Sequence, residues 1–313
     1  MNAFTIIVGV IILYCIVELA IGGYRYYPRK SIDLKRRYGD GWVIITGGSS
    51  GQGKQFALQL AEKGFKLVLI GSKNSYKTAE EVKSKYGTDT IVIEKDFNHA
   101  YEKDFFVDVS EQIKDLDISI LINNIGHRTG WMPSHFQPDQ DVIDTISCGT
   151  FVQVRLTNII LPMMLQREHK SSIIFITAQC MVNGAAFSSP EISVPYLGVY
   201  EASNAFGFYH ACSIYKEYGE SIDVMNVMPG AVITDNTDFL KNTFGAVKQE
   251  KFVKNIISMM GRVTGNTCGY WKHALSSHVM PNVSLIKDPI VENVGKTISK
   301  SYMEKYYQSK EKQ

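Results

Sequence analysis

The chain has 313 residues, of which 45% are hydrophobic, and this size allows one large buried α/β core. A formal net charge of +2 gives no reason to expect a nucleic-acid partner. The five cysteines are scattered and form no Cys-x-x-Cys pair, which argues against disulfides and against a metal site. We therefore expect one globular domain with appendages and no metal.

The first appendage is an apolar stretch at residues 3–23, interrupted only by Glu18 and long enough to cross a bilayer. The lysines and arginines that follow it predict that the main domain faces cytosol or matrix. A cleaved signal peptide or a mitochondrial presequence would need basic residues before the apolar stretch, and a buried core helix would rarely be followed by a basic run. We therefore predict a single-pass anchor in membrane lipid at 1–24 and a basic linker at 25–40.

The next feature is a glycine-rich turn. An apolar run at 42–45 precedes Thr-Gly-Gly-Ser-Ser-Gly-Gln-Gly at 46–53, and helix-forming sequence follows at 54–63. Gly51 lets the backbone approach a pyrophosphate, and Gly53 lets the helix pack close to the strand. The helix N-terminus would present unpaired N–H groups to the phosphates. This pattern predicts a dinucleotide site lined by Gly47, Ser49, Ser50, Gly51, Gln52 and Gly53.

Apolar runs then alternate with helical patterns along the chain. Further strands are expected at 67–70, 90–93, 118–122, 173–177 and 222–228, and long helices at 103–116, 139–165 and 197–218. Such alternation is typical of a doubly wound parallel sheet covered by helices on both faces. We assign this domain to residues 41–280. Residues 281–313 become polar and rich in lysine and tyrosine, which predicts a C-terminal helical tail.

Several motifs occur in an order typical of one family. They are Gly41-Trp42, the glycine turn, Asp96-Phe97, Asn123-Asn124-Ile125-Gly126, Leu161-Pro162-Met163, Pro229 to Thr234, Gly269-Tyr270 and His273-Ala274-Leu275. Over roughly residues 41–275 the chain resembles the short-chain dehydrogenase/reductase family, which has a Rossmann-type fold. Within it, the chain is most similar to the membrane-anchored branch of 17β-hydroxysteroid dehydrogenases and very-long-chain 3-oxoacyl-CoA reductases. The resemblance implies NADP or NAD as cofactor.

The resemblance also assigns cofactor-binding residues. It implies that Asp96 contacts the adenine, that Asn123, Asn124 and Gly126 line the cofactor, and that Thr234 touches the nicotinamide amide. The alternative is that Asp96 and Asn124 are only turn and strand-end residues. The family's arginine for an NADP 2′-phosphate is replaced by Ser72, and Lys73 beside it is the candidate for that role.

The catalytic positions depart from the family pattern. The resemblance implies a tyrosine that protonates the substrate carbonyl, a lysine four residues later, a serine after the fifth strand and an asparagine on the long helix. Tyr200 matches the tyrosine. The other three positions are occupied by Asn204, Ala178 and Ser147, with Thr177 one residue before the serine position.

The missing lysine and serine affect the tyrosine pKa and the reaction rate. Moving a tyrosine pKa from about 10 to about 7 requires roughly 4 kcal/mol. A neutral asparagine cannot supply the field of an ammonium group. The loss of one donor to a developing oxyanion commonly costs about 10²–10³ in rate. The substitutions therefore predict impaired catalysis.

Replacement by other groups remains an alternative, with His127, Arg128, Lys73 and His135 as candidates and Ser188 as a substitute for the serine. No spacing argument places them in the cleft, and such residues are more commonly exposed. The stretch at 181–199 is longer than in most of the family. It would act as a lid, a plug or a partner surface.

Two functional hypotheses follow. The first is a catalytically impaired membrane protein that still binds a dinucleotide and serves as an accessory subunit with protein partners, in the mitochondrial inner membrane or the endoplasmic reticulum. The second is an active NADP-dependent reductase of long-chain 3-oxoacyl-CoA or steroid carbonyls. Fold alone does not decide between them.

Overall fold

The computed structural model describes residues 31–126, 132–179, 195–234 and 245–279, with short pieces at 9–10, 12–14, 16–17, 26, 237–238, 241–242, 293, 296–297, 299–300 and 303–304. Its centre is a seven-stranded sheet in the order β3-β2-β1-β4-β5-β6-β9, with every pair parallel. The strands are β1 (Trp42–Thr46), β2 (Lys66–Gly71), β3 (Thr90–Glu94), β4 (Ile118–Asn123), β5 (Ser172–Ile176), β6 (Asp223–Val227) and β9 (Gly265–Thr267). The doubly wound sheet predicted from the sequence is confirmed.

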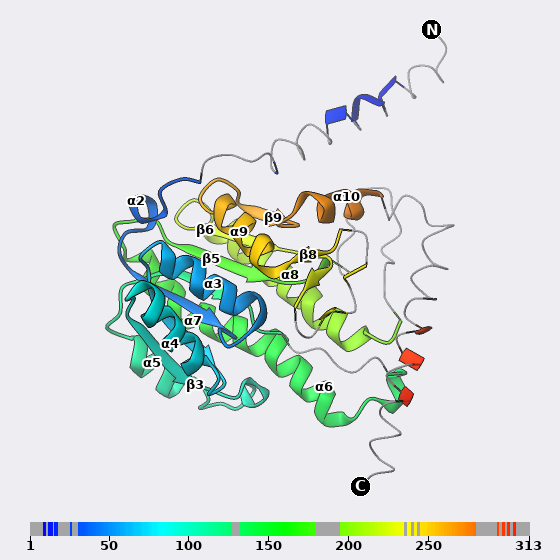
Figure 1. Cartoon of the computed structure of the whole chain (residues 1–313), viewed down its shortest axis with the longest axis horizontal. Coiled ribbons are helices and arrows are strands. Elements are labelled where there is room, and N and C mark those ends of the chain that lie inside the picture. The colour runs from blue at the N-terminus through cyan, green and yellow to red at the C-terminus, as the bar shows by residue number, and fades with distance from the viewer. Residues whose placement is uncertain are drawn as a thin grey trace.

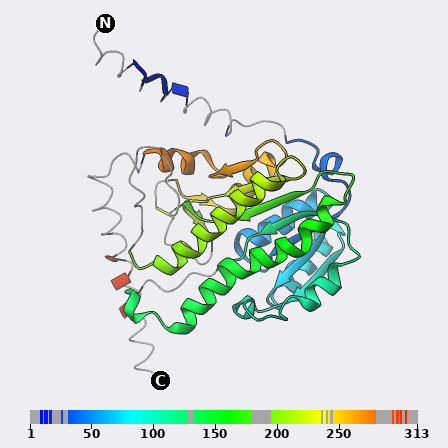
Figure 2. The same ribbon diagram turned by 180° about the vertical axis from the view of Figure 1, so that it is seen from behind.

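Helices cover both faces of this sheet (Figures 1 and 2). One face packs against α2 (Leu34–Tyr38), α3 (Gly51–Glu62), α4 (Ser75–Tyr86) and α9 (Gln249–Met259). The other packs against α5 (Val107–Ile113), α7 (Val152–Leu165) and α8 (Gly198–Tyr218). α6 (Asp139–Ile146), one π-helical turn η3 (Ser147–Phe151) and α7 form one long helix, and η1 (Phe97–His99), η2 (Ser134–Phe136), α10 (Trp271–Val279) and a small pair, β7 (Val232–Ile233) with β8 (Val247–Lys248), complete the fold.

The buried strands explain why the apolar runs in the sequence are continuous. In β1, Val43 and Ile45 belong to the core on the α3 face, while Ile44 belongs to the core on the α7 face. All three side chains are fully buried. Because parallel strands are covered on both faces, each position needs an apolar side chain, and period-two alternation disappears.

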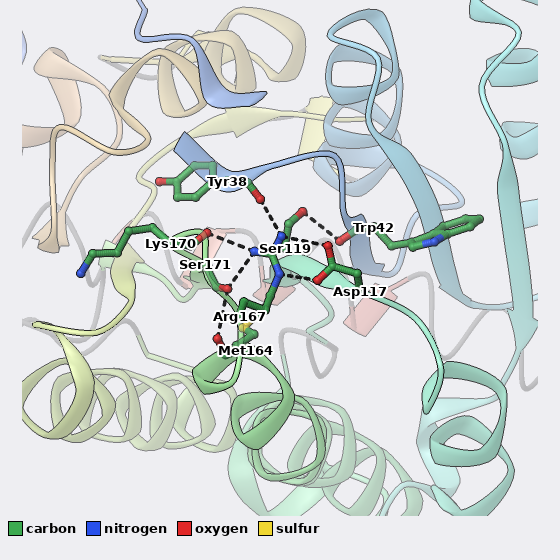
Figure 3. A network of polar contacts seen from close by, with 8 residues as sticks. All are labelled: Tyr38, Trp42, Asp117, Ser119, Met164, Arg167, Lys170 and Ser171. Carbon is green, nitrogen blue, oxygen red and sulfur yellow. Dashed lines mark hydrogen bonds and ion pairs between the residues drawn. The ribbon is translucent and has the colours of Figure 1, made fainter. Parts of the chain in front are cut away.

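A polar network closes the amino-terminal edge of the sheet (Figure 3). The Arg167 guanidinium pairs with the Asp117 carboxylate and donates to the Tyr38 carbonyl at 2.8 Å. It also donates to the Lys170 carbonyl and to Ser171 Oγ, both at 3.1 Å. One side chain thus joins the segments that lead into three central strands, at the edge opposite the carboxyl ends where a parallel sheet binds ligands.

The predicted linker at 25–40 is packed in its described part. Leu34 and Tyr38 are buried, and the Arg37 guanidinium contacts the Asp223 carboxylate at 2.6 and 2.8 Å. The Tyr38 hydroxyl donates to the same carboxylate at 2.8 Å. Residues 31–40 are therefore part of the domain, because a buried charge at Asp223 requires these partners.

Within the described residues, one helix is long and apolar enough to cross a membrane, Asp139–Leu165 with a mean hydropathy of 1.3. Its α7 part packs against β4 and contributes to the core, as a soluble domain's core helix does. The anchor predicted at 3–23 lies mostly outside the described residues, as does the tail predicted at 281–313.

Candidate functional site

The turn after β1 has the backbone conformation that its glycines permit. Gly47 and Gly51 have positive φ angles of 69° and 55°, a region that L side chains rarely adopt. A Cβ atom at Gly53 would lie 2.1 Å from the Gly47 carbonyl oxygen. Only glycine therefore lets α3 start directly against the turn. Ser50, the N-cap of α3, makes no side-chain capping bond, which leaves the first N–H groups of the helix for an anion.

A cavity of about 390 Å³ opens beside this turn at the carboxyl ends of β1, β2 and β3. Five of the predicted cofactor residues, Gly47, Ser49, Lys73, Asp96 and Gly126, line it. The rest of its lining is Gly71, Ser72, Glu94, Lys95, Phe97, Asn98, Ile125 and Cys148. A parallel sheet presents ligands at this edge, so the cavity fits the adenosine half of a dinucleotide.

Two lysines line this cavity, and they differ in whether an ion pair already engages their charge. Lys95 Nζ lies 2.6 Å from the Asp108 carboxylate and 4.7 Å from the centre of the Phe105 ring. Lys73 is exposed and forms no ion pair within the described part of the chain. Lys73 is therefore the cation that can meet a phosphate without giving up a partner. The Asp96 carboxylate caps η1 by accepting from the Asn98 N–H at 3.1 Å.

The two asparagines at the end of β4 hydrogen-bond to neighbouring elements, Asn124 to β1 and Asn123 to α7. The Asn124 N–H donates to Thr46 Oγ1 at 2.9 Å and its side-chain amide to the Thr46 carbonyl at 3.0 Å. The Asn123 amide donates to Thr157 Oγ1 at 3.2 Å. Neither asparagine lines the cavity. Of the turn after β4, only Ile125 and Gly126 line it. The geometry supports the strand-end role that the sequence left open for Asn124.

Tyr200 lies half-buried in the first turn of α8, beyond the carboxyl end of β5. Asn204 is one turn further along, and its Nδ2 donates to the Tyr200 carbonyl at 2.9 Å. Ser203 Oγ donates to the same carbonyl at 2.8 Å. The amide at the family's lysine position is therefore used inside its own helix and carries no charge.

The end of β5 offers no hydroxyl at the family's serine position, because Ala178 is there and is buried. Thr177 Oγ1 points toward β6 and hydrogen-bonds Asn226 Oδ1 at 2.9 Å. The Gln179 amide donates to the His273 carbonyl at 2.7 Å, in α10. The neighbours of Ala178 are thus directed away from the position where a serine would polarise a carbonyl.

Ser147, at the family's asparagine position, begins the π-helical turn η3. It is buried, and its Oγ donates to the Phe97 carbonyl at 2.9 Å. The hydroxyl therefore joins the long helix to η1 behind the adenosine cavity. π-Helical turns often mark functional positions, but here the polar group inside the turn has a structural partner.

Thr234 follows β7 and is fixed by its own loop. Its N–H donates to Thr237 Oγ1 at 2.8 Å, and the two hydroxyl oxygens are 2.8 Å apart. Buried His273 supports this loop: its Nδ1 accepts from the Gly230 N–H at 3.2 Å. Burial lowers the pKa of His273, so the ring is neutral and its Nδ1 can accept. The loop that would hold a nicotinamide is thereby tied to α10.

Five lining residues of the cavity were missed from the sequence: Gly71, Glu94, Lys95, Asn98 and Cys148. Lys95 and Asn98 flank Asp96, so the motif at the end of β3 could have indicated them. Cys148 could not be found that way, because only the fold brings it to Asn98 Oδ1, 3.4 Å from its Sγ. Burial raises the pKa of this thiol to about 12, so it is a neutral part of the wall.

Of the candidate replacement groups, His135 is exposed on η2 and Lys73 lies at the adenosine cavity. His127, Arg128 and Ser188 lie outside the described residues, as does the predicted insertion except for 195–199. In the described part of the chain, no group of three His, Cys, Asp or Glu side chains could hold a metal ion.

The comparison with known families decides the family. Residues 41–243 match the short chain dehydrogenase family model. The chain belongs to the short-chain dehydrogenase family. It is 30% identical over 272 residues to a Homo sapiens protein named very-long-chain 3-oxoacyl-CoA reductase, covering 84% of this chain and 82% of the relative. A Rattus norvegicus protein of the same name is 31% identical over 245 residues, covering 76% and 74%.

Solved structures share the fold. A short-chain dehydrogenase from Sphingobium yanoikuyae in complex with NADPH has a TM-score of 0.62 at 23% identity, covering 72% of this chain and 87% of that one. A 7beta-hydroxysteroid dehydrogenase has a TM-score of 0.66 at 20% identity, covering 78% and 93%. The predicted resemblance to the family and to its very-long-chain 3-oxoacyl-CoA reductase branch is confirmed.

Proposed function

We propose that this protein binds a nicotinamide dinucleotide and has lost the family's proton-transfer machinery. The observation that carries the proposal is the state of the tyrosine's surroundings. The amide of Asn204 hydrogen-bonds the Tyr200 carbonyl, and Ala178 provides no hydroxyl at the end of β5. The protein then serves as an accessory subunit of a membrane assembly, and a bound dinucleotide contributes to its stability.

The binding half of the proposal rests on backbone and charge. The first N–H groups of α3 would hold the pyrophosphate, and Gly47 and Gly51 would let the backbone approach it. Lys73 at the cavity would meet a 2′-phosphate, and Asp96 would contact the adenine. Thr234 would fix the nicotinamide amide. When bound, the dinucleotide supplies a hydride donor or acceptor.

The proposed loss of catalysis concerns the proton that the tyrosine would donate to the substrate carbonyl. Tyr200 would have to donate a proton to a carbonyl near neutral pH, which needs a pKa roughly three units below its ordinary value of about 10. Each unit corresponds to about 1.36 kcal/mol, and an ammonium close to the ring usually supplies much of this field. A neutral amide at position 204 supplies none of it. The position that supplies this field in the family therefore carries no charge in this chain.

The test measures binding and turnover separately on the purified protein in mild detergent. We expect calorimetry to detect NADPH or NADH binding, while reduction of 3-oxoacyl-CoA and steroid ketones stays far below about 1–10³ s⁻¹, the usual range for enzymes. Tyr200→Phe is the matched control, because it removes only the hydroxyl. Turnover within that range that disappears in Tyr200→Phe would contradict the proposal.

The second candidate is an active reductase of very-long-chain 3-oxoacyl-CoA. The names of the relatives at 28–31% identity favour it more than they favour loss of catalysis. Tyr200 is also retained at the start of α8. This candidate needs a group other than position 204 to lower the tyrosine pKa, and activity in the unmodified protein would establish it.

The membrane and partner parts have their own tests. Deletion of residues 1–22 should release the protein into the soluble fraction in folded form, since the sheet begins at Trp42. Release of the full-length protein by carbonate would contradict an anchor. Size exclusion of a mild-detergent extract, followed by mass spectrometry of co-migrating proteins, tests the assembly. Migration as a lone 35.2 kDa chain with its detergent would contradict it.

A further inference from the structure

Two described residues before α2, Tyr26 and Ile32, lie near the two ends of the edge strand β9. The Tyr26 hydroxyl oxygen accepts from the Cys268 N–H at 2.8 Å and lies 3.1 Å from Thr267 Oγ1, at the carboxyl end of β9. Ile32 packs on the turn before β9, where a Cβ at Gly261 would lie 2.3 Å from its Cδ1. Tyr26 therefore lies at the carboxyl end of β9, and Ile32 lies close to its amino end.

Tyr26 lies next to the last residue of β9, and the carboxyl ends of all seven parallel strands lie at that edge. Tyr200 and Thr234 follow the carboxyl ends of β5 and β6 at the same edge. The apolar stretch at 3–23 is only a few residues from Tyr26. An anchor formed by this stretch would hold the nicotinamide end of the site close to the membrane.

The surface beside Tyr26 has the composition of a membrane interface. α10 begins three residues after Cys268 with Trp271, which is 50% exposed, and Leu275 on the next turn is 37% exposed. Lys272 Nζ lies 5.6 Å from the centre of the Trp271 ring. Residues 245–279, which include α9, β9 and α10, carry five lysines and arginines and one glutamate. Tryptophan prefers the headgroup level of a bilayer, and clustered cations attract anionic lipids.

α9, β9 and α10 lie together on one side of the domain, and α4 and α5 lie on the opposite side (Figures 1 and 2). Tyr26 contacts the end of β9 and is therefore on the same side as α10. We propose that the α10 surface, defined as Trp271, Lys272 and Leu275, rests in the headgroup layer of the membrane that holds residues 3–23. The nicotinamide end of the cleft then opens toward lipid. The inference depends on the membrane anchor of the proposed function, and it adds an orientation and a lipid contact.

Tryptophan fluorescence can test this contact, because the chain has only three tryptophans, Trp42, Trp131 and Trp271. The full-length protein carrying Trp42→Phe and Trp131→Phe is reconstituted into phosphatidylcholine–phosphatidylserine vesicles. Lipids brominated close to the headgroup should quench Trp271 at least about twofold, and more strongly than lipids brominated near the chain terminus.

The matched control keeps Trp42 alone. This residue begins β1 at the amino edge of the sheet, opposite the carboxyl edge where Tyr26 lies, and should not be quenched. Strong quenching of Trp271 with none of Trp42 supports the proposal. A vesicle-bound protein whose Trp271 is not quenched overturns the contact and leaves the anchor intact. A protein that does not float with vesicles overturns the anchor and the contact together. Thermal melting of both variants confirms that they are folded.

Discussion

The two ends of the dinucleotide cleft differ in how they are built. At the adenosine end, the main elements are a glycine turn, the N-terminus of α3 and a cavity of about 390 Å³ with Lys73 unpaired within the described chain. At the carbonyl end, Tyr200 remains, but Ala178 and Asn204 occupy the positions of the family's serine and lysine. Binding depends largely on backbone shape, and proton transfer depends on a few side chains.

The comparison explains how one end can be retained while the other is lost. The glycines of the binding end also set the packing of α3 against β1, so their loss would damage the fold. The replacements at the carbonyl end are all accommodated: Asn204 and Ser147 are hydrogen-bonded and Ala178 is buried.

The largest expected effect comes from restoring the carbonyl end. Asn204→Lys with Ala178→Ser should raise reductase activity about 10²–10³-fold over the parent, the usual worth of one preorganised donor or more. The effects of groups that act as a unit are not additive, so each single substitution should raise the activity much less than the double substitution does. Single-turnover assays with NADPH measure the gain. An inactive double mutant of a parent that binds NADPH tightly would indicate a blocked carbonyl site instead.

The second effect is at the binding end. Gly53→Ala places a methyl group 2.1 Å from the Gly47 carbonyl oxygen. Overpacking of this kind costs about 1–3 kcal/mol, so dinucleotide affinity should fall roughly 10–100-fold and the melting temperature should drop. Gly198→Ala is the matched control, because nothing lies within 4 Å of the added atom. Equal calorimetric affinities for the two variants would show that the glycine turn does not bind the cofactor.

A smaller effect concerns cofactor choice. Lys73→Ala should weaken NADPH binding by about tenfold, since charge-assisted bonds are worth roughly 1.5–3 kcal/mol before solvent exposure reduces them. NADH, which lacks the 2′-phosphate, should bind with unchanged affinity. Lys95→Ala is the control, because Lys95 is paired with Asp108. If NADPH and NADH lose affinity equally in Lys73→Ala, Lys73 does not meet the 2′-phosphate.

The smallest effect is a pH dependence of stability. Burial lowers the pKa of His273 and of His210 below the ordinary 6.5, so both are neutral in the folded protein. The unfolded chain takes up protons first as the pH falls, and stability should therefore decline below about pH 6.5, by at most about 1.4 kcal/mol per unit for each histidine. Thermal melts of the parent and of His210→Gln across this range separate the two contributions. A flat profile in His210→Gln would show that His273 does not contribute.

The sequence alone determined the sheet and the turn. Continuous apolar runs such as Val43–Ile45 identified strands covered on both faces, and the glycines at 47, 51 and 53 identified the strand–turn–helix unit. These features are local, because a run of side chains or a φ angle depends on neighbours in the chain. The substitutions at 147, 178 and 204 could likewise be counted from the sequence.

Only the tertiary structure decided what the polar residues do. Asn124 holds Thr46, Ser147 holds Phe97 and Tyr26 holds the end of β9, each across a long separation in sequence. Cys148 and Lys95 reach one cavity for the same reason. A buried polar group must find a partner, but the sequence does not say which one. The fold makes that choice, because it brings strand ends and helix turns from distant parts of the chain to one edge of the sheet.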